Sequence, residues 1–175
     1  LYGGENTKGL VVICHGLGGG AENYLAQTLS FVDEGYQVFG YDNTGCYNSE
    51  GESCIGLVQS VKDLDAALTF IEREERFKGL PVYLYGHSWG GYAVTAIFNY
   101  DHNIAASVSV SGFNKPMQMI IEWARGMMGS FAYVEYPYIW LYQKTVFGGD
   151  LDITAVNGIN NTDTPIMIVH GTADQ

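Results

Sequence analysis

The segment from Gly86 to Gly91 constrains the fold of this chain more than any other. It reads Gly-His-Ser-Trp-Gly-Gly, it follows directly on the apolar run 82–85, and it precedes a helix-like segment that reaches about Tyr100. Glycines two residues before and after Ser88 permit a sharp turn, because side chains at those positions would collide across it. The sequence therefore predicts a strand, a tight turn and a helix, with Ser88 at the end of the strand.

Short apolar runs alternate with amphipathic segments along the chain. Such runs are typical of strands buried on both faces, and they occur at residues 10–14, 37–41, 82–85, 104–110 and 166–169. Helices are expected from the Ser88 turn to about residue 100 and at residues 21–34, 54–76 and 115–128. Strands that alternate with helices form a parallel sheet with right-handed crossovers, so the expected fold class is α/β.

The charge balance argues against whole classes of partner. The chain has 8 basic and 19 acidic residues, a formal net charge of −11, and no cluster of lysine or arginine, so we expect no nucleic-acid binding. No apolar run approaches the length of about 18 residues that a membrane span needs. Three cysteines are too few for a disulfide scaffold, which favours a reducing, cytoplasmic setting and leaves a Cys46–Cys54 bridge open. The oligomeric state is not fixed by these features.

A second motif, His15-Gly16-Leu17-Gly18-Gly19-Gly20, follows the first apolar run. A serine exposed on such a turn can act as a nucleophile that accepts an acyl group. Acyl transfer passes through a tetrahedral oxyanion, which two preorganised N–H groups stabilise. With Ser88 as nucleophile, one donor is the backbone N–H of the next residue, Trp89. The other donor comes from the loop after a neighbouring strand, where Leu17 is best placed. Glycines let this backbone approach a substrate closely.

A third motif, His-Gly-Thr-Ala-Asp, spans His170 to Asp174 and follows the fifth apolar run. A catalytic histidine needs a carboxylate that holds its tautomer and stabilises the imidazolium. Asp174 suits that role, because it lies just beyond the carboxyl end of an expected parallel strand. The alternative is an aspartate that caps a helix.

The beginning of the chain also fits a dinucleotide-binding fold. Gly16-x-Gly18-x-x-Ala21 satisfies the glycine fingerprint, and Asp42 ends the next strand where an acid would bind the ribose. The later motifs argue against this interpretation, because a nucleotide fold has no use for a serine turn at its third strand. A P-loop is excluded, since no Lys-Ser or Lys-Thr follows the glycines. We therefore expect no cofactor.

A metal site is not expected either. The possible ligands at one sheet edge would be Cys14, His15, His87, His170 and Asp174. No ligand spacing recurs among them, and neighbours on a strand point to opposite faces of the sheet.

The order of these three motifs resembles that of the α/β-hydrolase superfamily. A further segment, Tyr41-Asp42-Asn43-Thr44-Gly45 followed by Ser49-Glu50-Gly51, resembles the D-x-R-G-x-G-x-S-x-G loop of its serine aminopeptidase and monoglyceride-lipase-like branch. Thr44 stands where that branch has arginine, and Tyr47 stands where it has glycine.

The resemblance implies a three-layer α/β-hydrolase fold, with a mostly parallel sheet of five strands and helices on both faces. It implies that residues 1–175 are a single domain, incomplete at both ends. It also implies that residues 113–163, where the strand and helix rhythm breaks and aromatic residues gather, are a cap inserted over the site.

The resemblance also assigns roles to the candidate site residues. Ser88 is the implied nucleophile, Asp174 the triad acid, and the amides of Leu17 and Trp89 the oxyanion hole. The family holds its catalytic histidine after the acid, so we expect that residue beyond position 175. By the same comparison, structural positions are occupied by His15, His87 and His170. His102 follows the helix after Ser88, so we expect it at the wrong end of the sheet for catalysis.

The expected function is therefore that of a serine hydrolase that forms an acyl-enzyme on a small-molecule carboxylic ester. An amidase or aminopeptidase acting on small peptides is the first alternative. A non-catalytic, hydrolase-like binding protein is the second. Serine at the turn argues against a dehalogenase, which would need an aspartate there.

Overall fold

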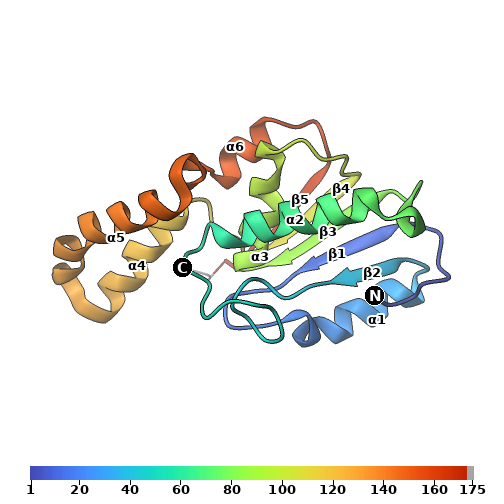
Figure 1. Ribbon diagram of the computed structural model, residues 1–175, viewed down its shortest axis with the longest axis horizontal. Coiled ribbons are helices and arrows are strands. Elements are labelled where there is room, and N and C mark those ends of the chain that lie inside the picture. Colours follow the sequence, from blue (N-terminus) through green and yellow to red (C-terminus); the bar gives the residue numbers. More distant parts are fainter. Residues whose placement is uncertain (173–175) are drawn as a thin grey trace.

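The computed structural model describes residues 1–172, and its centre is a five-stranded sheet (Figure 1). The order is β2-β1-β3-β4-β5, and all four pairings are parallel, as predicted. Tyr2 adds one antiparallel bridge to Val38 at the β2 edge. The strands are β1 (Leu10–Cys14), β2 (Gln37–Gly40), β3 (Val82–His87), β4 (Ala106–Val110) and β5 (Ile166–Val169).

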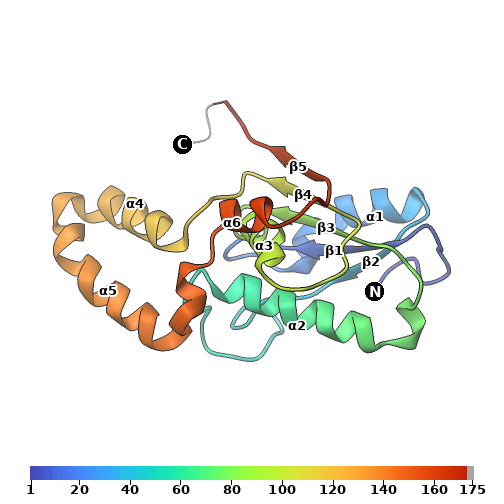
Figure 2. The ribbon, with the colours of Figure 1, turned by 90° about the horizontal axis from the view of Figure 1, so that it is seen from above.

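Helices cover both faces of the sheet and complete three layers (Figure 2). One face carries α1 (Leu25–Asp33), and the other carries α2 (Gln59–Arg73), α3 (Trp89–Ala96) and α6 (Ala155–Asn160). The remaining α-helices, α4 (Pro116–Met128) and α5 (Ala132–Phe147), pack against each other. Short 3-10 turns are η1 (Ala21–Tyr24), η2 (Glu75–Phe77), η3 (Ile97–Asn99), η4 (Gly129–Phe131) and η5 (Gly148–Asp152).

The all-apolar sequence of β1 follows from its central place in the sheet. Successive side chains of a strand point to opposite faces, so Leu10, Val12 and Cys14 enter the larger core beneath α2 and α3. Val11 and Ile13 enter a smaller core with Phe31 and Val32 of α1. All five side chains of β1 are buried, which anchors the loop that follows Cys14.

Two expectations about the helices were wrong. Residues 54–58, expected to begin a long helix, are not α-helical, and α2 begins only at Gln59. Ile55 has a φ of 54°, which no α-helix allows. The aromatic segment after α4, for which no helix was predicted, forms α5 with Pro137 inside it.

The hairpin of α4 and α5 projects from one side of the sheet (Figures 1 and 2). Large apolar side chains are exposed along both helices, among them Trp123, Met127, Tyr138 and Leu141. No helix in residues 1–172 is both long and apolar enough to cross a bilayer.

Candidate active site

Ser88 occupies the turn between β3 and α3 in a conformation that side chains rarely adopt. Its φ is 55° and its ψ is −111°, and its backbone N–H donates to the carbonyl oxygen of Val110 on β4 at 2.8 Å. Such a backbone costs free energy and persists only where the surrounding structure enforces it. The serine therefore stands partly exposed at the carboxyl end of two adjacent parallel strands.

The glycines around Ser88 are required by close backbone contacts. A side-chain carbon at Gly90 would overlap the carbonyl group of Cys14 at the end of β1, and one at Gly86 would overlap the carbonyl of Gly90. A side-chain carbon at Gly91 would lie 2.9 Å from the Cα of Gly112. The sequence motif thus lets α3 begin directly against the sheet, as the Gly-x-Ser-x-Gly spacing predicted.

The loop after β1 lies beside Ser88. Cys14 pairs with Gly86 in the parallel register, so the loops that follow β1 and β3 leave the sheet at the same edge. A groove of about 330 Å³ is lined by Ser88 together with Gly16, Leu17, Gly18, Gly19, Asn23, Tyr24, Tyr47 and His87. The structure therefore brings two of the predicted site residues, Ser88 and Leu17, to one solvent-accessible groove.

His15 holds the base of that loop. Its ring is fully buried, and Nε2 accepts a hydrogen bond from the backbone N–H of Asn43 at 2.8 Å. The neutral ring therefore carries its proton on Nδ1, which lies 2.8 Å from the carbonyl oxygen of Gly16. His15 thus ties the loop after β1 to the loop after β2, which is a structural role.

Tyr24 links the same loop to the residue before the serine. Its hydroxyl oxygen accepts from the backbone N–H of Gly16 at 3.0 Å and lies 2.9 Å from Nδ1 of His87. Burial raises the pKa of Tyr24, so the phenol stays neutral and keeps its proton for this network. The Tyr24 hydroxyl thus joins the Gly16 backbone to the His87 side chain at the groove.

Trp89 is placed beside Ser88 by its position in α3. As the first residue of the helix, it has a backbone N–H for which an α-helix supplies no partner. Its indole is fully buried and donates from Nε1 to the carbonyl oxygen of Leu57 at 2.6 Å. The side chain is therefore an anchor, while the N–H remains at the helix N-terminus near the serine.

Asp174, the predicted acid, lies outside the described residues. The strand before it is formed as expected, since β5 pairs with β4 and Ser111 N–H donates to the Val169 carbonyl at 2.8 Å. His170 directly follows β5, which ends on the same side of the sheet as the strand before Ser88.

The acid at the end of β2 has structural partners. Asp42 accepts from the backbone N–H of Ala21 at 2.8 Å through Oδ1 and from that of Asn48 at 3.4 Å through Oδ2. The carboxylate thus fixes the start of η1. Its oxygens are used in the fold, where the dinucleotide alternative would have them bind a ribose.

The cysteines have no metal or disulfide partner in the described part of the chain. Burial raises the pKa of Cys14 to about 12, so its sulfur stays a thiol in the core. Cys46 and Cys54 are free. Within residues 1–172, no three His, Cys, Asp or Glu side chains are grouped to bind a metal ion.

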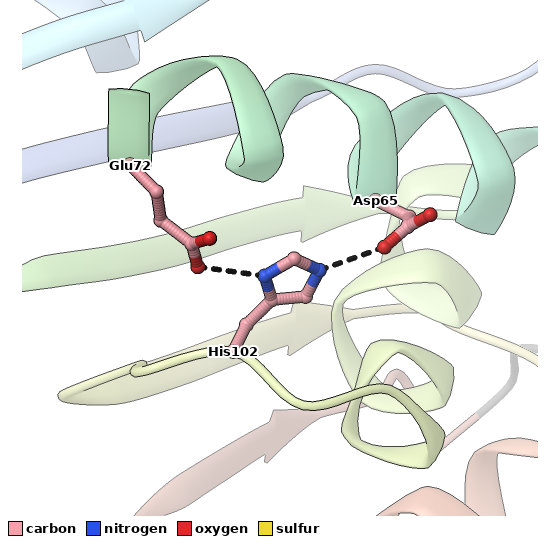
Figure 3. A network of polar contacts seen from close by, with 3 residues as sticks. All are labelled: Asp65, Glu72 and His102. Carbon is pink, nitrogen blue, oxygen red and sulfur yellow. Dashed lines mark hydrogen bonds and ion pairs between the residues drawn. The ribbon is translucent and has the colours of Figure 1, made fainter. Parts of the chain in front are cut away.

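His102 precedes β4, so it lies at the end of the sheet where the strands begin, opposite to Ser88. It contacts two acidic side chains of α2 (Figure 3). Nε2 is 2.8 Å from Asp65 and Nδ1 is 2.8 Å from Glu72, and only 6% of the side chain is exposed. Burial disfavours the charged ring, but the hydrogen bonds to Glu72 and Asp65 outweigh it and raise the pKa of His102. This arrangement fits an ion pair that stabilises the fold.

Sequence reasoning missed two groups beside the site. Tyr24 and Tyr47 line the groove. Gln143 on α5 donates to the carbonyl oxygen of Ile55, two residues before Leu57, the partner of the Trp89 indole. The departure of Tyr47 from the branch motif was the one signal for the first group. For Gln143 there was none, because its partners are distant in the sequence.

Solved structures share this arrangement of elements. The Pyrococcus furiosus esterase Pf2001 matches with a TM-score of 0.66 and 23% identity, over 93% of this chain and 61% of that chain. Est1E from Butyrivibrio proteoclasticus, solved with ferulic acid bound, matches with a TM-score of 0.71 and 19% identity, over 94% of this chain and 69% of that chain. The fold is that of the α/β-hydrolases.

The family described as serine aminopeptidase, S33, matches residues 5–148, and the chain belongs to that family. Proline iminopeptidase of Clostridioides difficile (strain 630) is 36% identical over 94 residues, which are 50% of this chain and 30% of that protein. Quorum-quenching protein AidA of Acinetobacter baumannii (strain MDR-ZJ06) is 30% identical over 122 residues, 66% of this chain and 40% of that protein. The matched stretches thus span less than half of either relative. The resemblance read from the sequence is confirmed.

Proposed function

We propose that this protein is a serine hydrolase that cleaves small carboxylic esters through an acyl-enzyme at Ser88. The observation that carries the proposal is the strained backbone of Ser88, at φ 55°, beside a groove that Leu17 also lines. A structure retains such strain where a reacting group has to project from the sheet.

In the proposed reaction, Ser88 Oγ attacks the ester carbonyl carbon while a histidine takes its proton. The carbonyl oxygen becomes an oxyanion, which the backbone N–H groups of Leu17 and Trp89 stabilise. The imidazolium then protonates the leaving alcohol, and the acyl group stays on Ser88. Water, deprotonated by the same histidine, then attacks the acyl carbon. The bond from that carbon to Ser88 Oγ breaks, Oγ takes a proton from the imidazolium, and the acid leaves. Asp174 orients that histidine, which we assign to a position outside residues 1–175.

We propose that residues 113–163 form an insertion beside this site, and that its hairpin of α4 and α5 is the cap, because α6 packs against α3 on the sheet. The segment leaves the sheet just after the carboxyl end of β4, the edge at which Ser88 stands. It is tied to α3 by Phe113, whose ring stacks on Tyr92 with centroids 4.9 Å apart. The exposed apolar side chains of the hairpin suit contact with an acyl chain.

An aminopeptidase is the second candidate, and the similarity to a proline iminopeptidase favours it. The ester proposal draws on the esterase fold relatives and on the tyrosines of the groove. A binding protein without catalysis would not need the strained backbone of Ser88. A cytoplasmic location remains part of the proposal and rests on the low cysteine count.

The experiment is a comparison of kcat/KM for aryl esters of graded acyl length and for amino-acid aryl amides, with the complete gene product. Faster ester cleavage, absent from Ser88→Ala, is the expected result. Faster cleavage of the amides would replace the ester proposal with the peptidase. Saturable binding of both substrate classes without turnover would favour the binding protein.

A further inference from the structure

We infer that Gln143 is a positioning residue, through which α5 sets the placement of the Trp89 N–H. The inference rests on the proposed function, because it assigns that N–H to the oxyanion. The connection consists of two side-chain hydrogen bonds to one short segment, residues 55–57, which separates α5 from Trp89.

The first bond joins α5 to the segment. Gln143 is 4% exposed, and its Nε2 donates to the carbonyl oxygen of Ile55 at 3.0 Å. Gly56 lets the helix come this close, because a side-chain carbon there would overlap the Gln143 amide and lie 2.7 Å from the ring of Phe147. The segment is therefore pressed directly against α5.

The second bond joins the segment to the candidate site. The Trp89 indole donates to the carbonyl oxygen of Leu57 at 2.6 Å, from a position with no solvent exposure. Ser60 adds to this contact, since its hydroxyl lies 3.3 Å from the Leu57 carbonyl and 3.4 Å from that of Trp89. A shift of Leu57 is thus passed to the residue whose N–H follows Ser88.

Two features of this connection lower the stability of the fold. The Oε1 atom of Gln143 is buried without a hydrogen-bond partner among the described residues. A buried polar group without a partner destabilises the folded state, because it gives up its hydrogen bonds to water and gains none in the protein. Ile55, the acceptor, is held at a φ of 54°, where a β-branched side chain is strained. An apolar side chain in place of Gln143 would avoid the first cost, so stability alone does not explain the amide.

The consequence is that loss of the Gln143 bond should act on catalysis. Oxyanion donors work through fixed geometry, and small displacements of a donor weaken transition-state binding more than substrate binding. When α5 no longer holds Ile55, the segment and the Trp89 anchor gain freedom. We therefore expect kcat to fall and KM to change little.

The test uses Gln143→Met in the complete gene product. Met keeps the volume and removes the donor. The matched control is Lys144→Met, at the next position of the same helix. This change removes a 2.7 Å ion pair to Asp152 and leaves the contacts of residues 55–57 in place. We expect kcat to fall about tenfold for Gln143→Met and to stay within about twofold for Lys144→Met. Gln143→Asn, whose amide is too short to reach Ile55, repeats the test if the Met variant does not fold.

A double-mutant cycle supplies a readout that a merely structural role would not move. Trp89→Phe removes the indole bond to Leu57, so Gln143→Met should lose most of its effect on kcat in that background. Additive effects of the two changes, or equal kcat for Gln143→Met and Lys144→Met, would overturn the inference while a serine hydrolase remained. A wild-type protein with no reactivity at Ser88 would overturn the proposed function and this inference together.

Discussion

The strain at Ser88 can be measured by comparing two variants that lack the hydroxyl. Ser88→Ala keeps the Cβ atom and Ser88→Gly removes it, so their difference isolates the cost of a side chain at φ 55° and ψ −111°. A residue held in such a region costs about 1–3 kcal/mol, whereas glycine loses an additional 0.5–1 kcal/mol or so of chain entropy on folding. Ser88→Gly should therefore be more stable than Ser88→Ala by about 1 kcal/mol.

Calorimetry or circular dichroism would report this as a Tm about 2–4 °C higher for the glycine variant. Ser30, exposed in the middle of α1, supplies the control with the opposite sign. There Ser30→Gly should be less stable than Ser30→Ala, by about 1 kcal/mol, because the helix is regular. The reasoning about strain is refuted if Ser88→Gly melts at or below the temperature of Ser88→Ala.

Two further predictions concern stability. Gly90→Ala should lower the Tm by several degrees or prevent folding, because the new methyl would overlap the Cys14 backbone; a thermal melt equal to that of wild type would contradict the close contact. The charged His102 stabilises the fold most below its ordinary pKa of 6.5, since its pKa is raised in the folded state, and this contribution is lost as the pH rises through the raised value. Chemical denaturation from about pH 6 to about pH 9 should therefore show wild type losing free energy of unfolding relative to His102→Gln. The same pH dependence of this free energy in both proteins would refute a role for the ion pairs to Asp65 and Glu72.

The sheet was predictable because its strands carry their own signal. The five apolar runs matched strands to within two residues at each end, and the strands pair in parallel as the alternation with helices predicted. The Ser88 turn was predictable for a related reason. Its geometry depends on glycines that lie two residues away in the sequence, so the pattern and the conformation are both local.

The segment at residues 54–58 was not predictable because distant contacts determine it. Its apolar residues continue the stripe of α2, which favours a helix. In the structure, the Gln143 amide and the Trp89 indole bind its carbonyl groups instead, and Ile55 adopts a positive φ. Tertiary hydrogen bonds from residues far along the chain therefore override the local preference.

The second hairpin helix was missed for two physical reasons. Pro137 interrupts the hydrogen-bond pattern of a helix interior, and aromatic residues on all sides of α5 leave no single apolar stripe. The contact of His102 with two acids was also beyond reach. Asp65 and Glu72 are two turns apart on α2, and only the packing of that helix over the chain before β4 brings them to the ring.

Covalent labelling with a fluorophosphonate tests the central claim most directly. The reagent needs an activated serine: Oγ forms a bond to phosphorus, the phosphorus–fluorine bond breaks, and fluoride leaves. The complete gene product should gain one phosphonyl group, which peptide mass spectrometry should locate on Ser88. Ser88→Ala, folded by its thermal melt, should gain none. Labelling that persists in Ser88→Ala, or that lies on another residue, would contradict the account.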